Sequence, residues 1–236
     1  MTATAAVLRV LSGGAAKAVV GALEAAIFEV TGATTDATFG AVGAMRERLV
    51  AGDACDVVIL TEALVAELTT SGHLVAGASA PLGGVRTGIA VRSGEPLPAI
   101  ADRATLAATL RAAKCIHIPD PQRATAGIHF DHVLRALGIH DAVAPCLRTW
   151  PNGATAMQHL AQSREPHAVG CTQITEIVDT DGVQLVGALP PPFELVTVYA
   201  AAVSASAADP ERARRLVTLL AASASAPTRT AAGFEV

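Results

Sequence analysis

Four turns of the sequence combine small residues with the start of a predicted helix, an arrangement that can bind anions. The turns are Ser12-Gly13-Gly14, Gly40-Ala41-Val42-Gly43, Thr125-Ala126-Gly127 and Asn152-Gly153-Ala154. Small residues let the backbone approach a ligand, and the unpaired N–H groups of a helix start carry roughly half a positive charge. Ordinary capping would explain Ser12, Thr125 or Asn152 singly. Four such turns, two in each half, favour a shared anion site.

Five other side chains are candidates for chemistry on a bound anion. Arg86 can clamp a carboxylate through two parallel hydrogen bonds, or form a salt bridge at a hinge. Arg123 is a second candidate cation, or a solvated loop residue. His129, one turn inside the third helix start, is the candidate proton carrier, and Glu176 is the candidate carboxylate. Thr61 can offer a hydroxyl to the ligand or cap the following helix.

Composition argues against several other classes of protein. The 236 residues are 51% hydrophobic and 16% charged, with a net charge of −4, so no basic surface for nucleic acid is expected. No apolar run approaches the length of a membrane span. The sequence holds no nucleophile elbow, no Walker loop and no dinucleotide-binding glycine motif. We expect neither a metal nor a cofactor.

The cysteines do not form a recognisable metal or redox motif. None of Cys55, Cys115, Cys146 and Cys171 belongs to a CxxC pair. Cys115 and Cys171 lie in apolar runs and are predicted to be buried. A disulfide stays open at this stage. His117, inside the run Cys-Ile-His-Ile, is predicted to be a hydrogen-bonded core histidine.

Hydrophobic periodicity predicts an α/β protein. Apolar strand-like runs alternate with helical patterns, which implies mainly parallel sheets with right-handed crossovers. The expected strands are 7–11, 34–39, 56–60, 87–91, 115–118, 167–171, 183–186 and 195–202. The expected helices are 15–30, 41–51, 62–70, 103–113, 126–137, 153–163, 173–179 and 209–222.

Two such series, separated by Gly- and Pro-rich segments, predict two lobes. Lobe 1 is expected to comprise residues 1–84 and 194–236, because the last helix would bury its apolar face there most simply. Lobe 2 is expected to comprise residues 85–193. The chain crossings near 84–87 and 190–195 would then form a hinge.

The motifs, in their order and spacing, resemble the molybdate-binding type of solute-binding protein, which has the type 2 periplasmic-binding-protein fold. The resemblance runs nearly end to end. It includes the Ser12-Gly13 loop, Phe39 to Ala44, Gly52 to Ile59, Arg86 to Arg92, Asp120-Pro121 with Ala126-Gly127, Leu134 to Ile139 and the Gly-Phe-Glu ending at 233–235. It implies two lobes, each with a mainly parallel sheet flanked by helices, and a ligand cleft between them.

The resemblance also implies which residues contact the ligand. The family holds its anion with two loops from each lobe and an aromatic hydroxyl. Here the loops correspond to Ser12 with Gly13, Ala41 with Val42, Thr125 with Ala126, and Gly153 with Ala154. The aromatic position falls on Gln173, and the hydroxyl of the second loop is replaced by Ala41 or Val42. Both departures weaken the case for a bare oxyanion such as molybdate.

The segments around Gln173 and 186–191 are more similar to a branch that includes aconitate isomerase. We therefore expect a protein that binds a small di- or tricarboxylate and catalyses an allylic proton shift. The alternative is a binding module for a molybdate-like oxyanion or organic anion, serving an ABC permease or acting as a sensor. Because the sequence shows no export signal, we expect a cytoplasmic location, or a periplasmic one if such a signal precedes this chain.

Overall fold

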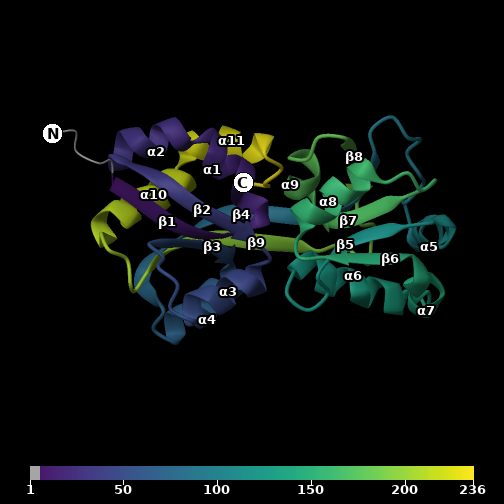
Figure 1. Cartoon of the computed structure of the whole chain (residues 1–236), viewed down its shortest axis with the longest axis horizontal. Coiled ribbons are helices and arrows are strands. Elements are labelled where there is room, and N and C mark those ends of the chain that lie inside the picture. The colour runs from purple at the N-terminus through teal and green to yellow at the C-terminus, as the bar shows by residue number, and fades with distance from the viewer. Residues whose placement is uncertain (1–5) are drawn as a thin grey trace. The chain divides into compact units, whose positions relative to one another are not determined.

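The computed structural model describes residues 6–236, which divide into two compact units (Figure 1). Unit 1 consists of the described residues up to Gly84 together with Val198–Val236, and unit 2 consists of Val85–Thr197. The chain therefore passes between the units twice. The first passage lies within the long strand β4 (Leu74–Arg92) and the second within β9 (Val196–Ser204).

Unit 1 is built on three parallel strands. Strand β1 (Ala6–Gly13) pairs in parallel with β2 (Ala33–Gly40) on one side and with β3 (Val57–Thr61) on the other. Strand β9 joins antiparallel to β3. Parallel strands covered on both faces are apolar throughout, which explains the run Val-Val-Ile-Leu in β3, where every side chain is buried. Their parallel direction brings the carboxyl ends of β1, β2 and β3 to the same edge.

Helices cover both faces of this sheet, and the C-terminal segment belongs to unit 1 (Figure 1). Arg229 is buried, and its guanidinium donates to the carbonyl oxygens of Leu220 (2.6 Å) and Ala222 (3.0 Å), which lie at the C-terminal end of a helix. The helices of unit 1 are η1 (Gly14–Ala16), α1 (Lys17–Ala22), α2 (Glu24–Thr31), α3 (Val42–Val50), α4 (Glu62–Thr70), α10 (Pro210–Ala221), η3 (Ser223–Ser225) and α11 (Ala226–Ala231).

Unit 2 repeats the parallel arrangement with a different antiparallel border. Strand β5 (Ile116–Pro119) pairs in parallel with β6 (Leu147–Trp150) and β7 (Val169–Gln173). Strand β4 runs antiparallel to β7 and to β8 (Val183–Ala188). The carboxyl ends of β5, β6 and β7 therefore meet at one edge, where Gln173 lies directly opposite Thr87 of β4.

The two faces of this second sheet carry different helices and different cores (Figure 1). On one face Ile89 and Cys171 belong to the same buried cluster as Phe130 of α6 (Thr125–Ala136). On the other face Ala90 belongs to a smaller cluster with Met157 of α8 (Gly153–Gln162). The remaining helices of unit 2 are α5 (Arg103–Ala112), α7 (His140–Val143), η2 (Ala144–Cys146) and α9 (Ile174–Val178).

The structure differs from the sequence-based expectations at three places. The strand expected at 87–91 is the last part of the 19-residue β4, which also includes Pro81. The backbone of β4 changes direction at glycines such as Gly83, whose φ of 132° is readily adopted only by glycine. The helix expected at 15–30 is interrupted at Leu23, where φ and ψ (−98°, 6°) leave the helical region. Strand β6 was not expected, since two of its four residues are exposed and the segment lacks an apolar pattern.

Candidate ligand-binding site

The first expected loop, Ser12-Gly13, lies at the carboxyl end of β1 in unit 1. Ser12 is fully buried, and its Oγ donates to the carbonyl oxygen of Gly13 (2.8 Å) instead of capping a helix. A Cβ atom at Gly13 would lie 2.8 Å from Cγ1 of Val42 and 3.0 Å from Cε1 of Tyr199. Only glycine therefore fits between Val42 of the second loop and the ring of Tyr199, for which no role was expected from the sequence.

The second expected loop forms the start of α3. Ala41 is its N-cap residue, with extended backbone (φ −62°, ψ 137°), and no side chain caps the helix. The N–H groups of its first turn thus have no side-chain acceptor from the N-cap residue. By contrast, Thr61 caps α4 by accepting from the N–H of Leu64 (3.3 Å), which is the capping role that the sequence also allowed. Ligand contacts by Ala41, Val42 and Thr61 stay predictions.

In unit 2 the third expected loop forms the start of α6, which is also uncapped. Its N-cap residue is Ala124, so Thr125 is the first helical residue and not the cap. A Cβ atom at Gly127 would lie only 2.5 Å from the carbonyl oxygen of Pro119 and 2.4 Å from that of Asp120. The missing side chain at Gly127 lets the first turn of α6 sit directly on the end of β5. Ala126 is buried in the same turn.

Gln173 and Thr87 place two unsatisfied polar atoms on the α6 face of the unit 2 sheet. Gln173 follows Cys171 by two residues and Thr87 precedes Ile89 by two, so both share the face of the α6 cluster. Their side chains are 3% and 1% exposed. Within residues 6–236, Oε1 of Gln173 and Oγ1 of Thr87 have no hydrogen-bond partner.

The other end of the Gln173 amide is bound. Its Nε2 lies 3.3 Å from Oγ1 of Thr197. A hydroxyl both donates and accepts, so turning the amide over would keep this bond and direct the NH₂ group away from Thr197 instead. A buried polar atom without a partner costs about 1–3 kcal/mol. Gln173 and Thr87 together therefore provide hydrogen-bonding capacity that the described protein does not use.

The fourth expected loop, Gly153-Ala154, contacts Glu176. Asn152 caps α8 by accepting from the N–H of Thr155 (2.8 Å), so the capping interpretation of Asn152 is correct. A Cβ atom at Gly153 would lie 1.9 Å from Oε2 of Glu176. Burial raises the pKa of Glu176, while hydrogen bonds from Thr172 and from backbone groups of Ala154, Gln173 and Gly153 lower it. The start of α8 thus faces a carboxylate of the chain itself.

Arg86 and His129 also have partners within unit 2. Nη1 of Arg86 lies 3.9 Å from Oε1 of Glu194, which is a long distance for an ion pair, and both side chains are half-exposed. Nε2 of His129 lies 2.8 Å from the carbonyl oxygen of Phe193, so this nitrogen carries the proton and donates it. His129 therefore anchors the segment that leads into β9. Roles for Arg86 as a clamp and for His129 as a proton carrier stay predictions.

His117 is a buried core histidine, as the sequence indicated. Its Nδ1 accepts from Nε1 of Trp150 (3.1 Å), and its Nε2 lies 3.2 Å from Sγ of Cys115. Burial first, then the charges of His159 and Arg148, lower its pKa to about 4. Because Nδ1 accepts, the ring is neutral with its proton on Nε2. All four cysteines are free thiols, and Cys115 and Cys171 are buried as expected.

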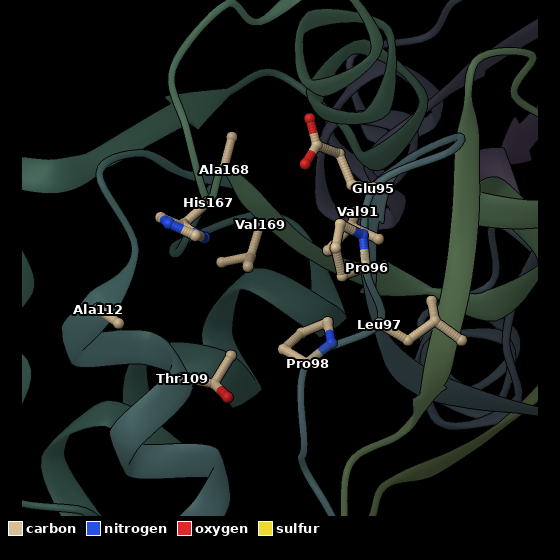
Figure 2. A pocket seen from close by; sticks show the side chains of 10 residues that line it. All are labelled: Val91, Glu95, Pro96, Leu97, Pro98, Thr109, Ala112, His167, Ala168 and Val169. Atoms are coloured by element: carbon tan, nitrogen blue, oxygen red, sulfur yellow. The ribbon is translucent and has the colours of Figure 1, made fainter.

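A separate pocket lies at the N-terminal end of β7, away from Gln173 (Figure 2). Its volume is about 220 Å³, and its lining includes Pro98, Thr109, His167 and Val169. Val169 begins β7 whereas Gln173 ends it, so this pocket is not at the carboxyl edge of the parallel strands. Residues 6–236 contain no cluster of side chains suited to a metal ion. None of the helices in that range is long and apolar enough to cross a membrane.

Comparison with known proteins identifies the family. The family described as bacterial extracellular solute-binding protein matches residues 8–235. The chain belongs to this family. A curated relative of the solute-binding protein is an aconitate isomerase from Pseudomonas sp., 27% identical over 182 residues. The alignment covers 75% of this chain and 66% of that relative, just under two thirds of its length.

Solved structures show the same fold. The periplasmic molybdate-binding protein of Azotobacter vinelandii superimposes with a TM-score of 0.81 at 18% identity, covering 97% of this solute-binding protein and 99% of that chain. The sulfate-binding protein of Mycobacterium tuberculosis gives a TM-score of 0.76 at 16% identity, covering 97% and 86%. These likenesses confirm the expected α/β fold of the type 2 periplasmic-binding-protein class and the resemblance to the molybdate-binding type.

Proposed function

We propose that this solute-binding domain binds a small di- or tricarboxylate, and that the pair Thr87 and Gln173 contributes donors to it in unit 2. The single observation that carries the proposal is this pair of buried polar atoms without partners, on neighbouring strands and on one face of the sheet. A hydroxyl and an amide NH₂ are suited to the two oxygens of one carboxylate.

The uncapped start of α6 supports the same ligand class. Strands β5 and β7 run parallel, so their carboxyl ends, at Pro119 and Gln173, lie at the same edge of the sheet, and Asp120 directly follows β5. The first turn of α6 rests on Asp120, as Gly127 shows, so its N–H groups belong to the same edge as Gln173. Helix starts favour negative charge. In unit 1 the uncapped start of α3, beside Gly13 and Tyr199, is the corresponding candidate.

Two features favour a carboxylate over a bare oxyanion. The N-cap residue of α3 is Ala41, so the second loop offers backbone N–H groups without a side-chain hydroxyl there. In addition, the curated relative is an aconitate isomerase, whose name implies a tricarboxylate substrate. The fold itself does not distinguish the two classes, since its solved relatives include molybdate- and sulfate-binding proteins.

Calorimetry tests the binding proposal. Citrate, the two aconitate isomers and succinate are titrated into the protein, with molybdate, tungstate and sulfate as the competing class. Thr87→Val should weaken carboxylate binding about tenfold, which is ~1.4 kcal/mol. The matched variant Thr31→Val removes a buried hydroxyl of unit 1, bound to the carbonyl of Ile27, and should leave the affinity unchanged. Binding of oxyanions alone would refute the proposal.

A second candidate function is the allylic proton shift of an aconitate isomerase, which the curated relative favours. His129 and Glu176 are its candidate proton carriers. The decisive measurement is proton NMR in heavy water: an isomerase introduces deuterium into cis- or trans-aconitate, and a pure binding protein does not. Binding without exchange would support the other expectation, a component that serves an ABC permease or a sensor. The cytoplasmic location stays a prediction under either outcome.

A further inference from the structure

Glu176 lies at the start of α8 as a buried group built into unit 2. Its side chain is 7% exposed, and Oε2 accepts from Oγ1 of Thr172 at 2.5 Å. The Gly153 position is open only because it has no side chain: a Cβ atom there would lie 1.9 Å from Oε2 of Glu176 and 2.0 Å from Oγ1 of Thr172. The lack of a side chain at Gly153 therefore leaves room for the carboxylate of Glu176, which α9 provides.

The groups around this carboxylate are donors and not opposite charges. Backbone groups of Ala154, Gln173 and Gly153 hydrogen-bond to Glu176 and lower its pKa, against a larger effect of burial that raises it. None of these influences comes from a charged side chain. The hydroxyl of Thr172 is the strongest of the donors that favour the ionised form, and the backbone groups of Gly153 and Ala154 at the positive end of the α8 dipole act in the same direction. This is the environment that an anionic ligand would otherwise find at a helix start.

We propose that Glu176 is an internal anion that fills the start of α8, so that in unit 2 an anionic ligand uses the start of α6 alone. A second anion at Gly153 and Ala154 would meet the like charge of Glu176 at close range, which disfavours it. Glu176 is thus a positioning residue that sets selectivity: one carboxylate beside Gln173 is accepted, and an oxyanion that needs both helix starts is rejected. This inference rests on the proposed carboxylate site.

The proposal predicts chemical rescue. Glu176→Ala removes the carboxylate and leaves a hole of about its size beside unpaired N–H groups. We expect a lower Tm that sodium acetate or formate restores saturably in the millimolar range, whereas sodium chloride at equal ionic strength does not. Wild type and Glu165→Ala, which removes an exposed carboxylate of the same unit, should show no such gain. A Tm of Glu176→Ala that acetate raises no more than chloride overturns the proposal.

A second variant tests selectivity, and serves if Glu176→Ala does not fold. Glu176→Gln keeps the volume and the hydrogen bond to Thr172 but removes the charge. Its affinity for molybdate or sulfate should rise at least tenfold over wild type, while Glu165→Gln should match wild type. An unchanged or lower oxyanion affinity in Glu176→Gln contradicts the proposal. Failure of wild type to bind any carboxylate would refute the proposed function alone, because the acetate rescue needs no natural ligand.

Discussion

Tyr199 lies directly opposite Thr61 across the antiparallel pair of β3 and β9, with its ring beside Gly13. The only tyrosine of the chain is therefore buried at the carboxyl edge of the parallel strands of unit 1, in edge-to-face contact with Phe234 (6.2 Å, 75°). An aromatic hydroxyl is thus present in unit 1, although the position that the family resemblance assigned to one is occupied by Gln173.

The tight packing at Gly13 gives the first prediction. Gly13→Ala should reduce the free energy of unfolding by about 1–3 kcal/mol and weaken ligand binding, because Val42 and Tyr199 must move to admit the methyl group. Gly21→Ala is the matched control: it lies within α1, with no atom within 4 Å of the added Cβ, and should be neutral or slightly stabilising. Urea denaturation of both variants decides, and equal stability would contradict the packing argument.

Arg86 gives the second prediction, since it has two competing roles. As a ligand clamp it would make Arg86→Ala weaken carboxylate binding at least tenfold in calorimetry, because an arginine–carboxylate pair is bidentate and charge-assisted. Glu194→Ala removes only the 3.9 Å ion pair and should leave binding unchanged or slightly tighter. Equal affinity of folded Arg86→Ala and wild type would assign Arg86 to the ion pair alone.

The cysteines give the third prediction. Burial raises the pKa of Cys55 to about 11, and it also raises the pKa of Cys115 and Cys171 above the usual range. Cys146 is only half-buried. Because the thiolate is the reactive form, a disulfide reagent at pH 7.5 should modify Cys146 quickly in the native protein and the other three only on unfolding. Cys146→Ser should abolish the fast reaction; a fast phase that survives would contradict this.

The sequence predicted the buried parallel strands and most of the helices, because buried strands and amphipathic helices have local signatures, whereas the half-exposed parallel strand β6 has none. The run Val-Val-Ile-Leu of β3 and the turn of small residues at 40–43 could be identified without coordinates. Glu176 was selected as a candidate carboxylate, but its contact with Gly153 could not be predicted. That contact depends on how α8 and α9 pack beside Thr172, which no local pattern encodes.

Thr87 and Tyr199 were missed for a related physical reason. Both lie on strands whose antiparallel partners follow no rule of sequence order: Thr87 meets Gln173, and Tyr199 meets Thr61. Within the expected strand 87–91, Thr87 is the only polar residue, and this was the one available signal for it. The absence of a hydrogen-bond partner, which makes Thr87 interesting, is a property of the packed unit and is not visible in a strand taken alone.

His117 gives the last prediction, which concerns pH. The unfolded chain binds a proton on this imidazole near pH 6.5, whereas the folded protein keeps it neutral down to about pH 4. The unfolded state therefore binds more protons between these values, so stability is lost as the pH falls from 6.5 towards 4, by about 2–3 kcal/mol from this residue. Urea denaturation at pH 7 and pH 4.5, followed by the emission of Trp150, measures the loss.

Variants separate the effect of His117 from those of other groups. His117→Leu should be less stable than wild type at pH 7, because Nε1 of Trp150 loses its acceptor. The same variant should lose less stability than wild type between pH 7 and pH 4.5, since it has no imidazole to protonate there. His132→Leu, which changes an exposed histidine of α6, should retain the pH dependence of wild type. An equal loss in His117→Leu and wild type would show that protonation of His117 does not oppose folding.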